Sequence, residues 1–271
     1  MIRSDVYAES SGEILERGLE AADDLLLVNP TRQTMRELVS TYRDGHDQST
    51  VRLFADSQPL KDLIDDFLVA STIADLVVTE TLAVRTLETV PRNSLVLTED
   101  FLVSLIERDG SAVGLTTTDE SFVVETYDHY DRRWRRAEEF ALRTPPLSHI
   151  RETLGVEIGP QAVDDFDRII TTLDSTQGNG DDLDEVTIAL LVAANNGELL
   201  YDISRWGEDI KLASKATFSR TKNRLEDENL IDTEKVPIDV GRPRLRLMLA
   251  DGTLDATSIE DVAKRAQARL G

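Results

Sequence analysis

The chain of 271 residues contains no cysteine and few aromatic residues. Without cysteine it forms no disulfide, holds no metal through thiolates and offers no thiol nucleophile. Its apolar runs are shorter than the roughly 18–20 residues that a membrane span needs, and its first residues lack the apolar stretch of a signal peptide. We therefore expect a cytoplasmic protein without membrane association.

Basic residues are scarce relative to acidic ones: 52 Asp and Glu accompany 30 Lys and Arg, which gives a net charge of −22. Only 6 of the basic residues are lysine. Such a charge repels itself in dilute buffer, whereas molar salt screens the repulsion because the Debye length falls to about 3 Å at 1 M. This composition is typical of a protein from a haloarchaeon that accumulates salt, and an ordinary acidic protein is the alternative.

The first part of the chain alternates helical and strand patterns. Apolar spacing predicts helices over 9–22, 60–77 and 119–141, and another after Thr31, which can cap it. Short apolar runs predict strands that begin near 24 and cover 50–56, 81–87, 93–99, 101–107 and 111–117. This order predicts an α/β layer domain with a partly antiparallel sheet over residues 1–143.

Proline and a polar linker divide the chain after this domain. Pro145 and Pro146 cannot lie inside a helix, and we expect a connecting segment over 144–180 with one helix from Gln161 to Ser175. Its end, "DSTQGNGDDLD" at 174–184, has the small, polar composition of a linker. A second domain is predicted over 181–256, followed by a C-terminal helix within 257–271.

The second domain contains a local break in the acidic character. From Ser214 to Arg224 there are four basic residues and no acidic one, and residues 211–246 carry a net charge of +3. The predicted elements are a helix, the short strand "ELLYDI", a helix capped by Ser204, a turn, a helix that ends at Asn229, and two strands. This is the order of a winged helix-turn-helix, so double-stranded DNA is the predicted partner.

The helix that Ser214 caps has two different faces. At about 100° per residue, Phe218 and Leu225 point inward beside the aliphatic stem of Lys222. The opposite face carries small, hydrogen-bonding and basic residues that can enter a major groove. The residues predicted to contact DNA, including two at the wing, are Lys211, Ser214, Lys215, Thr217, Ser219, Arg220, Asn223, Arg224, Arg242 and Arg244. The alternative is a solvated face on which Arg220 and Arg224 only pair with nearby carboxylates.

Catalysis is not predicted. The histidines at 46, 129 and 149 lack the spacing to lysine and aspartate of a phospholipase-D-type nucleophile, and no glycine-rich phosphate loop is present. Neighbouring carboxylates such as Asp65 and Asp66 are more typical of an acidic surface than of a metal site. We therefore expect neither an enzyme nor a cofactor or metal.

A small-molecule effector and a second copy of the chain are further expected partners. Because α/β sheets bind ligands at strand ends, the candidate ligand residues are those that follow strands: Asn29, Thr31, Asp56, Thr116 and Asp119. For Thr31 and Asp119 the alternative is ordinary helix capping. Helix-turn-helix proteins commonly bind as dimers, so we expect a homodimer that uses the apolar stripe of the helix over 258–270, the helix over 161–175, or both.

The C-terminal half resembles the haloarchaeal transcriptional regulators of the TbsP (TrmB-suppressor) family, most specifically in "SKATFSRTKNRLE" and "VPIDVGRPRLRL". "RLFADSQPLKDLIDDFLVAS" and "LRTPPLSHIRETL" match as well, so the resemblance covers nearly the whole chain. The family implies sequence-specific regulators of sugar and central carbon metabolism genes. The N-terminal half is similar in layout to the phospholipase-D-like sensor domain of TrmB-type regulators. The alternative function is a protein-interaction module whose winged helix contacts another regulator or the transcription machinery.

Overall fold

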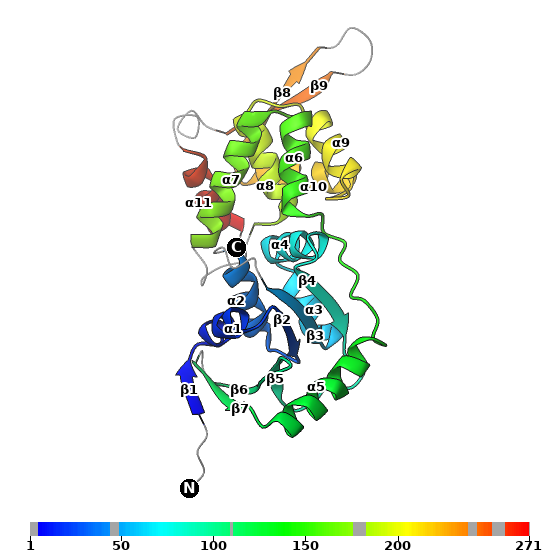
Figure 1. Cartoon of the computed structure of the whole chain (residues 1–271). Helices are drawn as coiled ribbons and strands as arrows, with labels where there is room; N and C mark the ends of the chain where they lie inside the picture. The colour runs from blue at the N-terminus through cyan, green and yellow to red at the C-terminus, as the bar shows by residue number, and fades with distance from the viewer. Residues whose placement is uncertain are drawn as a thin grey trace. The chain divides into compact units, whose positions relative to one another are not determined.

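The computed structural model describes residues 5–43, 49–108, 111–175, 183–237, 243–250 and 258–270. The chain divides into two compact units, Met1–Leu142 and Arg143–Gly271. Figure 1 shows that the first unit is built around a large sheet, whereas the second is mainly helical and carries a small hairpin. This division gives the α/β domain and the helix-turn-helix domain that the sequence predicts.

The sheet of the first unit has seven strands among the described residues, in the order β1-β7-β6-β5-β2-β3-β4. β2 pairs in parallel with β3, and β3 with β4, whereas every other neighbouring pair is antiparallel. The strands are β1 (Asp5–Glu9), β2 (Asp24–Val28), β3 (Thr50–Ala55), β4 (Leu82–Thr86), β5 (Ser94–Leu97), β6 (Leu102–Arg108) and β7 (Ser111–Thr117). The mixed sheet is as predicted, but the sequence reasoning missed β1.

Helices pack on both faces of this sheet. One face is covered by α1 (Ser11–Ala21), α2 (Arg32–Arg43), α3 (Ser57–Ile64) and α4 (Phe67–Val78). The other packs against α5 (Glu120–Trp134). The central strand β2 lies between both layers, and its residues Leu25–Val28 are completely buried. Two-sided burial explains why this strand reads as a continuous apolar run without alternation.

The single helix expected over 60–77 is in fact two helices, α3 and α4. Asp66 begins the second one, because its carboxylate accepts hydrogen bonds from the backbone N–H groups of Leu68 and Val69 at 3.1 and 3.2 Å. Arg36 pairs with the same carboxylate at 2.9 Å. A side chain that satisfies free N–H groups favours a new helix start, so Asp66 has a structural role.

Helix α5 ends at Trp134, earlier than the predicted end at 141. The residues that follow bond to the edge strand β4: Thr86 N donates to the carbonyl of Glu138, and Phe140 N to that of Val84, both at 3.0 Å. These bonds occupy backbone groups of an edge strand. Pairing with β4 therefore replaces the last helical turns.

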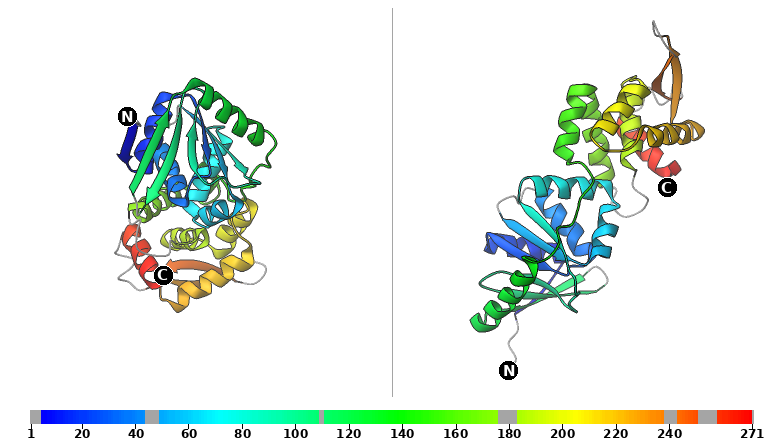
Figure 2. Two further views of the ribbon diagram at one scale, coloured as in Figure 1. Left: turned by 90° about the horizontal axis from the view of Figure 1, so that it is seen from below. Right: turned by 90° about the vertical axis from the view of Figure 1, so that its right-hand side faces the viewer.

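The second unit has the element order of a winged helix-turn-helix, preceded and followed by further helices. Its elements are α6 (Leu147–Glu157), α7 (Pro160–Ser175), α8 (Glu185–Asn195), α9 (Leu200–Asp209), α10 (Lys215–Asp227), β8 (Ile231–Val236), β9 (Arg244–Leu249) and α11 (Ile259–Leu270). Helix α8 forms the core, with every residue from Val186 to Ala194 buried. Figure 2 shows the antiparallel β8–β9 hairpin projecting from the helices of this unit.

Two local expectations at the start of α9 were wrong. "ELLYDI" is not a strand, because α9 already begins at Leu200. Only Leu199 pairs as in a sheet, through an isolated β-bridge to Arg246. Ser204 lies inside α9 and its hydroxyl donates to the carbonyl of Tyr201 at 3.2 Å, so it caps no helix. The end of α10 is as predicted, since Asn229 adopts the left-handed conformation with φ 52°.

The connecting segment expected over 144–180 contains two helices, and both belong to the second unit. The sequence reasoning missed α6, whose Ile150 and Leu154 are buried. Helix α7 packs on α6, α8 and α11. The stripe of α11 is buried within the chain, including Val262 and Ala266. The apolar faces that were expected to form a dimer interface thus pack on other elements of the same unit.

Candidate nucleic-acid interface

A tight turn joins α9 to α10 and sets where α10 begins. Lys211 adopts a left-handed φ of 63°, and the N–H groups of Leu212 and Ala213 both donate to the carbonyl of Gly207, at 2.8 and 3.3 Å. Ser214 then caps α10, as predicted: its hydroxyl accepts a hydrogen bond from Thr217 N at 3.2 Å. The N-terminus of α10 is therefore held in place by backbone and side-chain bonds together.

The inner face of α10 is the predicted one. Phe218 and Leu225 are fully buried, and Lys222 is 8% exposed. Lys222 Nζ binds the Glu226 carboxylate at 2.6 Å, and the hydroxyl of Thr233 on β8 donates to the same group at 2.8 Å. Desolvation opposes ionisation there, but these hydrogen bonds prevail and lower the pKa of Glu226. The hydrogen bond between Thr233 and Glu226 links α10 to the wing.

The opposite face of α10 is open to solvent and free of carboxylates as far as Arg224. Its side chains are exposed except for that of Thr217, which is half-buried, and the face comprises Lys215, Ala216, Thr217, Ser219, Arg220, Asn223 and Arg224. Arg220 lies 3.5 Å from the Thr217 hydroxyl, at the limit of hydrogen bonding. This contact leaves its guanidinium free to move.

Two basic residues of this face have stronger contacts. Lys215 pairs with Glu208 of α9 at 2.7 Å, and the hydrogen bond that it donates to that carboxylate raises the pKa of Lys215. Arg224 donates to the carbonyl of Leu270 in α11 at 2.8 Å, so it bonds to backbone and not to the carboxylates that follow it in α10. Of the predicted DNA residues, Arg224 is therefore partly engaged by the protein itself.

A basic and aromatic cluster forms where strand β9 of the wing meets α9. Arg244 on β9 stacks over the ring of Tyr201 at 4.1 Å and lies 3.8 Å from Asp202. Arg205 is on the same ring at 5.9 Å. Arg242 lies outside the described residues. Sequence reasoning missed Tyr201 and Arg205, although their i, i+4 spacing would have placed them together on a helix.

The candidate ligand residues of the first unit do not form one site. Asn29, Thr31 and Asp56 follow the parallel strands β2 and β3 at their carboxyl ends. Strand β7 runs in the opposite direction to β2, because β5, β6 and β7 are joined by successive antiparallel pairings. Thr116 and Asp119, at the carboxyl end of β7, therefore lie at the opposite end of the strands, where β2 and β3 begin.

Several of these candidates have structural partners. Thr31 caps α2, since its hydroxyl accepts from Thr34 N at 3.2 Å, and Asp119 caps α5 by accepting from Phe122 N at 3.0 Å. The latter bond lowers the pKa of Asp119. Asn29 donates to the carbonyl of Pro91 at 2.9 Å, whereas Asp56 occupies the cap position of α3 without a capping bond. Thr31 and Asp119 thus serve as helix caps, and Thr31 also donates to the Glu107 carboxylate at 3.1 Å.

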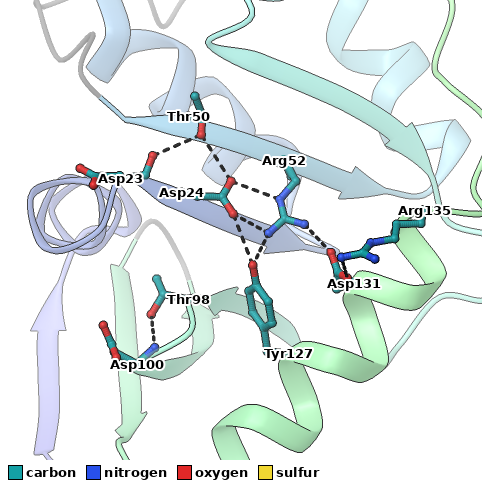
Figure 3. Close-up of polar contacts among 9 residues, drawn as sticks. All are labelled: Asp23, Asp24, Thr50, Arg52, Thr98, Asp100, Tyr127, Asp131 and Arg135. Atoms are coloured by element: carbon teal, nitrogen blue, oxygen red, sulfur yellow. Dashed lines mark hydrogen bonds and ion pairs between the residues drawn. The ribbon is translucent and has the colours of Figure 1, made fainter.

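The sequence reasoning also missed a polar cluster between the sheet and α5, shown in Figure 3. Arg52 of β3 binds Asp24 of β2 at 2.5 Å, Asp131 of α5 at 2.8 Å and the hydroxyl of Tyr127 at 2.6 Å. Arg135 pairs with the other oxygen of Asp131 at 2.8 Å. Although burial opposes its charge, the hydrogen bond to Asp24 prevails and raises the pKa of Arg52. Its guanidinium therefore holds α5 on the sheet.

Comparison with known proteins identifies the family. Residues 3–145 match the family model of the N-terminal domain of TbsP-like transcriptional regulators, and residues 146–267 match that of their C-terminal helix-turn-helix domain. The chain belongs to the TbsP-like family. This is a family of transcriptional regulators, and the resemblance noted in the sequence is confirmed over both units.

Other comparisons add little to this assignment. No curated protein matches the chain significantly. Similar solved structures include TrmBL2, an archaeal chromatin protein described with a novel mode of DNA binding, at 14% identity and a TM-score of 0.35 over 51% of this chain and 54% of that one. NucT from Helicobacter pylori has 10% identity and a TM-score of 0.34, over 51% of this chain and 99% of its own. The TbsP-like chain thus spans about half of TrmBL2, and likenesses this low do not bear on function.

No described helix of this TbsP-like regulator is long and apolar enough to cross a membrane. Within the same residues, no group of three or more His, Asp and Glu side chains is placed to hold a metal ion. The surface that remains as the candidate interface is the exposed face of α10 together with the Tyr201 cluster at the wing.

Proposed function

We propose that this regulator recognises its operator by placing the exposed face of α10 in the major groove. The observation that supports this most directly is the contrast between the two faces of α10: one is buried in the unit, and the other presents Arg220 and Asn223 to solvent, with no carboxylate in α10 before Glu226 and Asp227. Residues three apart lie next to each other on a helix surface. Arg can bind guanine and Asn can bind adenine through two hydrogen bonds each.

The groups around this face suit the phosphate backbone. Ser214, Lys215 and Thr217 lie at the N-terminus of α10, where the helix dipole and free N–H groups favour an anion. Arg244, stacked on Tyr201, carries positive charge on the wing. Phosphate contacts fix register and affinity and carry no sequence information. Lys211 and Arg242 are also proposed to contact DNA, on the basis of their positions in the sequence alone.

The biological setting is part of the same proposal. The excess of Asp and Glu over Lys and Arg supports a haloarchaeal, cytoplasmic protein, and the family resemblance supports target genes of sugar and central carbon metabolism. Counterion release contributes little to binding at molar salt, so a halophilic regulator depends on direct hydrogen bonds. A face with few basic residues but several hydrogen-bonding ones fits that requirement.

We further propose that the regulator binds as a homodimer that responds to a small-molecule effector. Two copies would place two α10 helices on the half-sites of a palindromic operator. Because the apolar stripes of α7 and α11 are already buried within the unit, we place the dimer interface on another surface. Sedimentation equilibrium at molar KCl tests this, and a monomer at the concentrations that bind DNA would contradict it.

Fluorescence anisotropy of the full-length protein at molar KCl tests the DNA proposal. Labelled promoter fragments of sugar-metabolism genes are compared with scrambled fragments of equal composition. We expect selective binding that Arg220→Ala and Asn223→Ala each weaken by about 1–3 kcal/mol, or about 5- to 150-fold. Arg168→Ala, which removes another exposed arginine of the same unit on α7, should leave affinity unchanged.

The alternative function gives a different result in this assay. If the winged helix contacts another regulator or the transcription machinery, the folded protein binds promoter and scrambled fragments equally. Equal binding by the wild type, with and without a metabolite extract, would therefore contradict the DNA proposal and favour the protein-interaction function.

A further inference from the structure

A pocket of about 240 Å³ lies in the first unit, between α1 and the strands β6 and β7. It is on the face of the sheet opposite the Arg52 cluster, because Val103 in its wall belongs to the core beneath α1–α4. Most of its lining is apolar, and the side chains that matter here are Ile14, Arg17, Ala21, Phe101, Val103 and Thr116.

Gly114 of β7 packs against two side chains of the pocket lining, Val103 of β6 and Ile14 of α1. Gly114 marks the close contact: a Cβ there would lie 2.8 Å from Val103 Cγ1 and 3.5 Å from Ile14 Cδ1. Thr116 is two residues further along β7, so its side chain points to the same face of the sheet. Thr116 also lines the pocket.

Thr116 brings a polar group into this mostly apolar space. Its hydroxyl oxygen is buried and has no hydrogen-bond partner among the described residues. An unsatisfied buried hydroxyl costs free energy, and in native proteins it calls for an explanation such as an unseen bound group. A ligand atom in the pocket would supply the missing hydrogen bond.

We propose that this pocket binds a compact apolar molecule that carries one carboxylate. Phe101, Val103 and Ile14 would surround the apolar body, and the Thr116 hydroxyl would donate to a carboxylate oxygen. Arg17 also lines the pocket, and the charge of its guanidinium favours an anion. The volume lies below the roughly 300–1,000 Å³ of sites for drug-sized ligands, so a single ring or a branched chain is the right size.

Fluorine NMR of the full-length protein at molar KCl tests this, with para-fluorophenylacetate as the probe. The expected result is saturable binding that Thr116→Val weakens at least about fivefold, the loss of one hydrogen bond to a charged group. Ala21→Phe, which fills the pocket, should abolish binding. Glu20→Phe adds the same ring at the adjacent exposed position of α1 and should leave binding intact.

Stability distinguishes a binding role of Thr116 from a structural one. Because the hydroxyl is unsatisfied in the free protein, Thr116→Val should raise the Tm of the first unit by about 2–4 °C while it weakens the probe. Ser71→Ala removes another buried, unpartnered hydroxyl, away from the pocket, and should raise Tm without changing probe affinity.

Two results would overturn the proposal: no saturable binding by the wild type, or binding that neither Thr116→Val nor Ala21→Phe reduces. A lower Tm for Thr116→Val would also count against it, since the hydroxyl would then be satisfied within the protein. The assay contains no DNA, so its outcome is independent of whether α10 binds an operator.

Discussion

Gly207 of α9 packs directly against Phe218 of α10, and Gly207→Ala should destabilise the second unit. A Cβ at this position would lie 2.4 Å from both Cε2 and Cζ of Phe218. Phe218 is completely buried, so any shift of its ring disturbs the close-packed core around it. The substitution therefore forces either the ring or the crossing of the two helices to shift.

The size of the effect follows from two opposing contributions. Replacing glycine by alanine inside a helix normally stabilises it by about 1 kcal/mol. Overpacking a core costs about 1–3 kcal/mol, and a contact about 1 Å shorter than van der Waals distance belongs at the upper end of that range. We expect a net loss of about 2 kcal/mol in the free energy of unfolding.

Urea unfolding followed by tryptophan fluorescence measures this loss in the correct unit. Of the two tryptophans, Trp134 lies in the first unit and Trp206 in the second, so a Trp134→Phe background leaves Trp206 as the reporter. Gly155→Ala on α6 is the matched control, because its Cβ would come no closer than 3.3 Å to a side chain. We expect this control to change stability by less than about 1 kcal/mol.

A double-mutant cycle tests whether the Phe218 ring is the cause. Phe218→Leu removes the ring atoms that the new Cβ would meet, so Gly207→Ala should cost less in that background than in the wild type. If Gly207→Ala stabilises the unit as an ordinary helical substitution does, the inferred close contact between α9 and α10 is wrong.

Three further changes test other contacts. Arg52→Leu deprives Asp24 and Asp131 of their shared partner and should cost the first unit about 2 kcal/mol, read from Trp134 fluorescence in urea; unchanged stability would mean that the cluster does not hold α5. Because the folded pKa of Glu226 is lowered, its contribution to stability is present above the unfolded pKa of about 4.3 and is lost as pH falls. The wild type should therefore lose more stability than Glu226→Gln between about pH 5 and 3, and parallel losses would contradict this. Arg269→Ala removes hydrogen bonds to the carbonyls of Glu228 and Asn229, just after α10, and should cost the second unit about 0.5–1 kcal/mol, read from Trp206 fluorescence in urea. No loss would show that α11 does not support α10.

The second domain was largely predictable because its signals are local. The Ser214 cap, the basic face of α10 and the left-handed Asn229 each depend on residues within one or two helical turns. The family resemblance covered the same segment. Local signals failed at Ser204, where the actual start of α9 is set by the bridge between Leu199 and Arg246 on β9, a residue far along the chain.

Features that depend on distant residues were missed. Arg52 reads as a polar interruption of an apolar strand, and only folding brings Asp131 and Tyr127 of α5 to it. The break between α3 and α4 at Asp66 is supported by Arg36 from another helix. The contacts of Arg224 and Arg269 with α11 and α10 likewise join segments that are far apart in sequence. The sequence pattern predicts which residues share a face of a helix or strand, but not which faces of different elements contact each other.

The most direct test of the central claim is binding-site selection from random DNA at molar KCl, compared between the wild type, Arg220→Ala and Lys215→Ala. If α10 reads bases, the wild type selects a defined site, and Arg220→Ala loses the preference at one or two positions of each half-site. Lys215→Ala should keep the preferences, weaken all sites alike and lower the salt slope by about one. If the wild type selects no site, or if Arg220→Ala selects the same one unchanged, then α10 does not read the operator as described.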